Sequence, residues 1–115
     1  MYEYRATVLR VIDGDTVDLD IDMGLHTHIH ERIRLDGINT PESNSKVAEE
    51  RTAAAAATEF LKSLLTDPKV TVKTKKDAQE KYGRYLGVVL NSAGVNVNEA
   101  LVTAGHAKPY SGGAR

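Results

Sequence analysis

The chain has 115 residues, of which 15 are Lys or Arg and 16 are Asp or Glu, so its formal net charge is −1. This length predicts a single domain over residues 1–115 with its own core, and the balanced charge excludes nucleic-acid attraction by net charge alone. Cysteine is absent and aromatic residues make up 5% of the chain, which excludes disulfides, thiolate metal sites and an extended base-stacking surface.

The first residues do not form a basic stretch followed by an apolar run, so we expect no signal peptide. No apolar run approaches the length that crosses a membrane, so a soluble protein without a membrane partner is expected. These features together predict a cytoplasmic protein, with export as the alternative.

The N-terminal stretch predicts a strand with an irregularity. Apolar and polar residues alternate from Tyr2 to Val8, which is the period of a half-buried strand. The apolar residues that follow do not continue this alternation, which predicts a bulge or bend near Leu9. The segment 13–15, Asp-Gly-Asp, has the composition of a turn.

Two further alternating runs, Thr16 to Met23 and Ile29 to Leu35, predict a β-hairpin that turns at Gly24. With a turn of about three residues, three aspartates of the first run share a face with three histidines of the second: Asp18, Asp20 and Asp22 with His30, His28 and His26. Such cross-strand pairs contribute roughly 0.2–1 kcal/mol each. Alternate histidines can also bind a transition metal, but no carboxylate or cysteine spacing supports a closed site here.

Helical periodicity runs from Lys46 to Leu65, with Asn44 or Ser45 as the N-cap and an Asp-Pro pair after the end. An alanine run at residues 53–57 favours the helix and allows it to approach a sheet closely. The expected buried stripe consists of Ala53, Ala57, Phe60, Leu61, Leu64 and Leu65.

The last third of the chain predicts two strands, Val70 to Thr74 and Arg84 to Leu90, separated by a polar loop. A short helix follows, with Asn96 as its N-cap and Gly105 at its end. Three strands, a helix, two strands and a short helix predict an α+β, mainly β protein. The expected fold is a five-stranded OB-type β-barrel with a helix after strand 3 and a short C-terminal helix.

Candidate metal ligands follow the first turn and the third strand, namely Asp15, Asn39, Thr40 and Glu42. Hard cations such as Ca²⁺ take about six to eight oxygen ligands, and a barrel can bring these two segments together. The alternative interpretation is that both segments are ordinary turns, which favour the same residue types.

Arg34 and Arg84 stand at strand ends beside turns and are candidates for holding a phosphate. The guanidinium group offers a planar set of donors that matches phosphate oxygens and stays charged at any working pH. The alternative for either residue is a solvated surface arginine, which is the more common environment of a single one.

Four collinear motifs, residues 11–17, 34–42, 81–84 and 97–102, resemble the staphylococcal nuclease (thermonuclease) family. The similarity extends from about Val8 to Lys108, which is nearly the whole chain. It implies a five-stranded OB barrel and hydrolysis of DNA and/or RNA with one Ca²⁺, leaving 3′-phosphate ends. A monomer is the expected state, with a dimer as the alternative.

The resemblance also implies roles for individual residues. Asp15 and the backbone carbonyl of Thr40 bind Ca²⁺, Asn39 stands at a further metal position, Glu42 is the general base, Arg34 and Arg84 neutralise the attacked phosphate, and Lys81, Tyr82 and Tyr110 line the nucleotide pocket. A cation and two guanidinium groups make chemical sense because a phosphodiester anion repels hydroxide.

Two departures from the family pattern matter. Asn39 replaces a metal-binding aspartate, so one anionic ligand is lost and more Ca²⁺ is expected to be needed; Asp36 is a candidate to restore some negative charge. The staphylococcal protein continues into a further helix past the position of Arg115, so either the frame closes without that helix or a partner subunit covers the gap.

Two other functions remain open from the sequence. One is an OB-type module that binds nucleic acid or protein with weak or no turnover, which the asparagine and the low net charge favour. The other is a structural or metal-buffering protein that uses the aspartate and histidine ladders.

Overall fold

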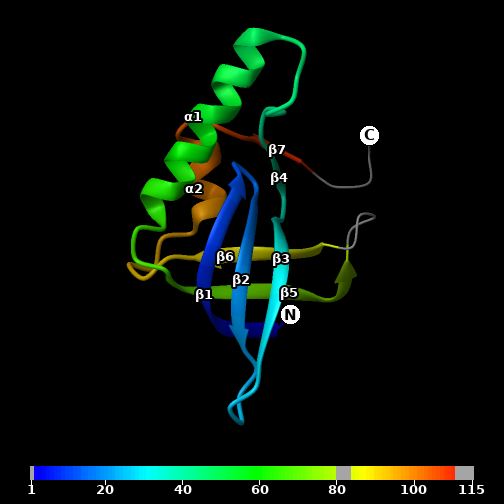
Figure 1. The fold of residues 1–115 in the computed structure, drawn as a ribbon, viewed down its shortest axis with the longest axis vertical. Coiled ribbons are helices and arrows are strands. Elements are labelled where there is room, and N and C mark those ends of the chain that lie inside the picture. Colours follow the sequence, from blue (N-terminus) through cyan, green and yellow to red (C-terminus); the bar gives the residue numbers. More distant parts are fainter. Residues whose placement is uncertain (1, 80–83, 111–115) are drawn as a thin grey trace.

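The computed structural model describes residues 2–79 and 84–110, and within them five strands close into a barrel (Figure 1). The elements in chain order are β1 (Tyr2–Asp13), β2 (Thr16–Asp22), β3 (His28–Leu35), β4 (Ile38–Asn39), α1 (Ala48–Leu64), β5 (Lys69–Gln79), β6 (Tyr85–Leu90), α2 (Val97–Thr103) and β7 (Lys108–Pro109). Around the barrel the order is β1-β2-β3-β6-β5, and β3 with β6 is the parallel pair. The predicted OB-type barrel is confirmed.

The strand β1 is long and bent because it pairs with two different neighbours. Its first half, Tyr2 to Thr7, pairs with β5, and its second half, from Ala6 onward, pairs with β2. The register with β2 shifts between Val8 and Arg10, so Leu9 is the extra residue of a bulge. The predicted irregularity near Leu9 is therefore confirmed, and it lets one strand close the barrel.

The turn between β2 and β3 is longer than predicted, and this moves the cross-strand pairs by two residues. Asp22 lies opposite His28, and Asp20 lies opposite His30, whereas His26 falls inside the turn. Of the predicted side-chain pairs, Asp20 with His28 is present, with Asp20 Oδ1 at 3.3 Å from His28 Nδ1. Residues 23–27 connect the two strands. Within this connection Thr27 N–H donates to Gly24 O (2.9 Å), and the two residues between them, Leu25 and His26, have positive φ. Nowhere in the described ranges do three His, Asp or Glu side chains gather as a metal site.

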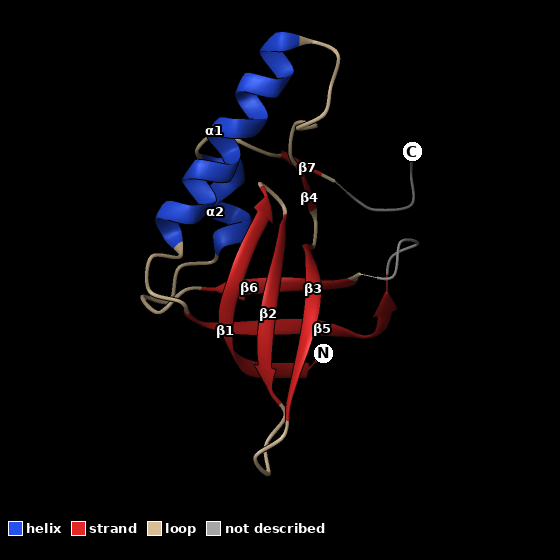
Figure 2. Ribbon diagram, viewed as in Figure 1, coloured by secondary structure: helices blue, strands red, loops and turns tan. Residues whose placement is uncertain are grey.

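Side chains that the strand alternation points inward fill the barrel, and the two helices cover one of its ends (Figure 2). The fully buried hydrophobic residues are Val17, Leu19, Ile33, Leu35, Ala57, Leu61, Val72, Val89, Val97 and Leu101. Burying a side chain of the larger of these types contributes about 1.5–3 kcal/mol. This core fixes the ends of β2 and β3, from which the candidate site residues project.

The helix α1 is where the sequence predicted, but its cap and its buried face differ. The N-cap is Val47 instead of Asn44 or Ser45, because the Ser45 hydroxyl accepts from Val47 N–H (3.1 Å) in a turn before the helix. Ala54 is buried in place of Ala53, alongside Ala57 and Leu61. A run of identical alanines has no polar contrast, so periodicity could not fix which alanine faces the barrel.

The remaining elements match the prediction with two differences. The strand predicted to stop at Thr74 continues to Gln79, so part of the expected polar loop is β5. The short strands β4 and β7, which pair with each other, were not predicted because two residues carry no periodicity. In α2, Asn96 accepts from Glu99 N–H (3.1 Å) and Gly105 has a φ of 83°, as the predicted cap and end require. Among the described helices, none has the length and apolar character needed to cross a membrane.

Candidate active site

The candidate site lies where the turn between β1 and β2 meets the segment after β4 and the helix α1. Gly14 makes this close approach possible: a Cβ at this position would lie 2.9 Å from Ala57 Cβ and 3.2 Å from the Thr40 side chain. Asp15 follows directly, and its backbone carbonyl accepts from Leu35 N–H (2.8 Å). The turn is thereby fixed to both the helix and the third strand.

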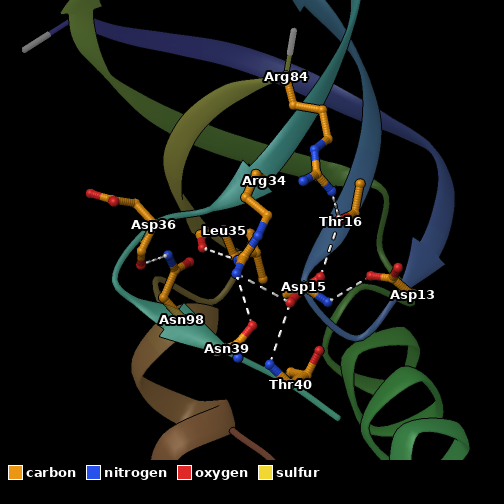
Figure 3. Close-up of polar contacts among 10 residues, drawn as sticks. All are labelled: Asp13, Asp15, Thr16, Arg34, Leu35, Asp36, Asn39, Thr40, Arg84 and Asn98. Carbon is orange, nitrogen blue, oxygen red and sulfur yellow. Dashed lines mark hydrogen bonds and ion pairs between the residues drawn. The ribbon is translucent and has the colours of Figure 1, made fainter. Parts of the chain in front are cut away.

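The carboxylate of Asp15 is the centre of a buried polar network (Figure 3). Its Oδ1 accepts from the Thr16 hydroxyl (3.1 Å), and its Oδ2 accepts from Thr40 N–H (3.3 Å). The Arg34 Nη2 atom lies 3.5 Å from the same Oδ2 atom. With Asp15 only 8% exposed, these partners replace most of the water that a free carboxylate would bind.

Arg34 is held in one orientation by three contacts. Its side chain is 11% exposed; Nη1 donates to Leu35 O (2.8 Å), and Nη2 donates to Asn39 Oδ1 (3.2 Å). The same Nη2 atom therefore contacts both Asp15 and Asn39. The structure thus brings Asp15 of the first turn close to Asn39 of β4, as expected from the sequence. The Arg34 guanidinium lies between the two candidate ligand oxygens, Asp15 Oδ2 and Asn39 Oδ1.

Asp13 lies beside Asp15, whose backbone N–H donates to Asp13 Oδ1 (3.1 Å). Burial, with the hydrogen bond and the negative charge of Asp15, raises the pKa of Asp13 from 3.8 to about 6. For Asp15, burial works in the same direction, but the hydrogen bond from Asp13, the charge of Arg34 and Thr40 N–H outweigh it and lower the pKa. Asp15 is thus the carboxylate that stays ionised in this pair.

Sequence reasoning missed two residues of this network, Asp13 and Thr16. The Thr16 hydroxyl, 1% exposed as a residue, donates to Asp15 and accepts from Arg84 Nη1 (3.3 Å), so it links the carboxylate to the second candidate arginine. Asp13 looked like a turn residue, and Thr16 looked like the start of a strand. Their position on either side of the predicted ligand Asp15 was the only available signal.

The other candidate residues lie around this network or outside the described ranges. Glu42 is exposed, and its backbone N–H donates to Glu50 Oε2 (3.2 Å). Tyr110 N–H donates to Gly37 O (2.8 Å), which places its backbone beside β4. The Asp36 side chain points away from Asp15 (Figure 3). Lys81 and Tyr82 lie outside the described residues.

The donor chemistry of this region fits Ca²⁺ in type. The Asp15 carboxylate, the Asn39 amide oxygen and the Thr40 carbonyl are all hard oxygen ligands of the kind that Ca²⁺ prefers. A second carboxyl lies beside this donor set, because Asp13 Oδ1 accepts from Asp15 N–H (3.1 Å).

A sequence profile of the family described as "Staphylococcal nuclease homologue" matches residues 32–114. The chain belongs to the staphylococcal nuclease family. This match includes Arg34, Asn39, Thr40 and Arg84, which lie around Asp15 and Thr16. Asp15 and Thr16 themselves precede the matched residues.

Several known proteins are similar to most of this chain. Endonuclease YhcR of Bacillus subtilis (strain 168) is 35% identical over 114 residues, which cover 94% of this chain and 9% of that protein. Thermonuclease of Staphylococcus intermedius is 36% identical over 104 residues, 90% of this chain and 59% of that protein. An uncharacterized endonuclease of Escherichia coli O157:H7 is 35% identical over 108 residues, 94% and 62% respectively. The chain thus spans less than two thirds of each of these relatives.

Proposed function

We propose that the protein is a Ca²⁺-dependent nuclease that hydrolyses phosphodiester bonds of DNA and/or RNA and leaves 3′-phosphate ends. The observation that carries this proposal is the buried network in which Asp15 contacts Arg34 directly and Arg84 through Thr16. One carboxylate flanked by two guanidinium groups is suited to an anionic substrate and a cation together. The nuclease names of three similar proteins support the same reaction.

The arginines are assigned to the phosphate. A guanidinium group has five N–H donors, and the hydrogen bonds of Arg34 to Leu35 and Asn39 use two of them. The remaining donors can bind non-bridging phosphate oxygens without breaking the network that orients the side chain. Arg84 approaches from the strand β6 side, so the two guanidinium groups offset the charge that grows on the phosphate during attack.

The oxygen ligands and the general base have separate roles. Asp15, Asn39 and the Thr40 carbonyl would hold Ca²⁺, which when bound supplies positive charge beside the attacked phosphate. Glu42 accepts a proton from the attacking water, and a positioned base of this kind typically contributes about 10²–10⁴-fold. The water oxygen bonds to phosphorus as the bond from phosphorus to O5′ breaks, and O5′ takes up a proton from solvent, which leaves a 3′-phosphate and a 5′-hydroxyl.

A binding module with weak or no turnover is the second candidate, and Asn39 is the observation that favours it. Its amide oxygen is neutral and already accepts a hydrogen bond from Arg34, so it competes less well for a cation than a carboxylate would. Such a module would bind nucleic acid through the same arginines without cleaving it.

Cleavage of labelled oligonucleotides separates the two functions. Single-stranded DNA, double-stranded DNA and RNA are each incubated with Ca²⁺ and, separately, with excess chelator. We expect Ca²⁺-dependent products with 3′-phosphate ends, and losses of roughly 100-fold or more in Arg84→Ala and Glu42→Ala. Arg10→Ala is the matched control, because Arg10 is an exposed arginine that pairs with Asp18 on the outside of the barrel. Binding without cleavage by the wild type would favour the module.

A further inference from the structure

The segment that carries Glu42 is tied to the first turn of α1 by side chains of that turn. Glu42 N–H donates to Glu50 Oε2 (3.2 Å), and the carbonyl of Ser45 accepts from Arg51 Nη1 (2.7 Å). On the other side, Thr40 N–H donates to Asp15. The three residues from Thr40 to Glu42 are therefore held between the buried carboxylate and the helix.

The direction of the Glu50 side chain is not explained by helix capping alone. Glu50 stands three residues after the N-cap Val47, where a glutamate commonly accepts from the N–H of the N-cap residue itself. Here the Val47 N–H donates to the Ser45 hydroxyl (3.1 Å). The Glu50 carboxylate is instead directed eight residues back along the chain, to Glu42.

We propose that Glu50 is a positioning residue for Glu42, fixing the backbone from which the general base reaches the attacking water. This inference rests on the proposed function. Glu42 is an exposed residue, and two hydrogen bonds restrain its backbone: its N–H donates to Glu50 Oε2 (3.2 Å), and its carbonyl accepts from Ser45 N–H at the longer distance of 3.4 Å. Bonds from N–H to an ionised carboxylate are roughly twice as strong as neutral ones.

The charge state of Glu50 agrees with this role. The Ser45 hydroxyl and the Glu42 N–H both lower the pKa of Glu50 below its usual value, so the acceptor is a carboxylate at neutral pH. An acidic residue in the first turn is also favourable for any helix. Glu49 shares that general role but not the contact with Glu42, and so it offers a matched control.

Kinetics with a DNA oligonucleotide and Ca²⁺ test the role of Glu50. We expect Glu50→Ala to lower kcat roughly 10- to 100-fold while KM changes less than about twofold, because the base is displaced while the phosphate-binding arginines are intact. Glu50→Gln keeps an acceptor oxygen and should recover most of this loss. Glu49→Ala should leave both constants within about twofold of the wild type.

Amide exchange of Glu42, followed by NMR without Ca²⁺ or DNA, tests the contact itself. Glu50→Ala should raise the Glu42 exchange rate about tenfold, and Glu49→Ala should not. Equal kcat losses in the Glu49→Ala and Glu50→Ala variants, or faster exchange with unchanged kcat, would overturn the positioning role. Absence of cleavage by the wild type would remove the proposed function and this role with it. Cleavage by the wild type with an unaffected Glu50→Ala variant would remove only the positioning role.

Discussion

Thr16 connects Asp15 to Arg84 through the two hydrogen bonds of its hydroxyl. Its buried hydroxyl donates to Asp15 and accepts from Arg84, whereas valine has the same shape without either capability. We expect Thr16→Val to lower the free energy of unfolding by about 1–2 kcal/mol, because Asp15 loses a hydrogen-bond donor in a buried place. Urea denaturation measures this, and Thr16→Ser, which keeps the hydroxyl, should recover most of the stability. Equal losses in both variants would mean that the methyl group, not the hydroxyl, is what matters.

Asn39 is the residue of the proposed metal site whose charge tests the Ca²⁺ assignment. Aspartate at this position would add an anionic ligand and would still pair with the Arg34 guanidinium that Asn39 contacts now. We expect Asn39→Asp to lower the half-saturating Ca²⁺ concentration of cleavage about tenfold, equivalent to about 1.4 kcal/mol of binding free energy. Asn39→Ala removes the oxygen and should shift the concentration the other way. An unchanged half-saturation in Asn39→Asp would show that this position does not contact the metal.

At the residue scale, the sequence predicted that Asp15 would meet Asn39 and Thr40, but not which groups connect them, and Glu42 of the same predicted set is exposed. Asp15, Arg34, Asn39 and Thr40 come together, because a barrel brings the first turn next to the end of the third strand. The connecting groups are a hydroxyl and a second carboxyl whose residue types are ordinary in turns and strands. Their contribution depends on burial, which no local pattern reports.

At the scale of elements, the hairpin of β2 and β3 carries a cross-strand ion pair with a defined pH dependence. Arg32 donates to both carboxylate oxygens of Asp18 (2.8 and 3.2 Å) and, with Arg10 nearby, holds the pKa of Asp18 below its usual value. The unfolded chain therefore binds more protons, so the stability from the pair is full above the unfolded pKa of 3.8 and is lost as pH falls through the lower folded pKa.

We expect Asp18→Asn to cost less than about 1 kcal/mol at pH 7, since this pair is partly exposed and screened by solvent. The difference from the wild type should shrink as the pH falls below about 4, through the lowered folded pKa of Asp18. Urea unfolding at several pH values measures this difference. Adding Arg32→Gln to Asp18→Asn should cost nothing further at pH 7, and an additive second loss would contradict the pair.

Helices and strands were predictable where apolar and polar residues alternate with a clear period. The bulge at Leu9 was visible as a slip in the alternation, and the cap of α2 was visible in Asn96 and Glu99. The length of the β2–β3 turn was not predictable, because Leu25 and His26 adopt positive φ values that non-glycine residues rarely take. The buried face of α1 was not predictable at its alanine run, because identical residues give no contrast between faces.

At the scale of the whole molecule, the closed barrel couples the candidate site to global stability. Asp15 lies in a turn, Arg34 in β3 and Thr40 after β4, so a ligand that contacts all three joins segments that separate on unfolding. The topology itself followed from the order of the elements and the family resemblance. The amount by which bound ligands stabilise the fold depends instead on the binding free energy of the cation and the substrate.

We therefore expect Ca²⁺ and a nucleic-acid oligomer together to raise the thermal unfolding midpoint. A ligand at about 100 times its Kd adds roughly 2.7 kcal/mol of stability, and each 1 kcal/mol raises Tm by about 4–8 °C in a domain of 60–100 residues. For this chain of 115 residues we expect Tm to increase by about 10 °C. Calorimetry measures this increase, with a phosphorothioate oligonucleotide that resists hydrolysis.

Asp15→Asn is the decisive comparison for this shift. It keeps the shape of the side chain but removes the charge that Arg34 contacts and that the proposed cation would contact, so Ca²⁺ should add little to its Tm beyond the oligonucleotide alone. Asp22→Asn changes the same charge at the far end of the hairpin and should retain the full shift. A shift of equal size in Asp15→Asn would place the cation elsewhere on the molecule. A shift with the oligonucleotide that is the same in Ca²⁺ and in chelator would identify binding that needs no metal.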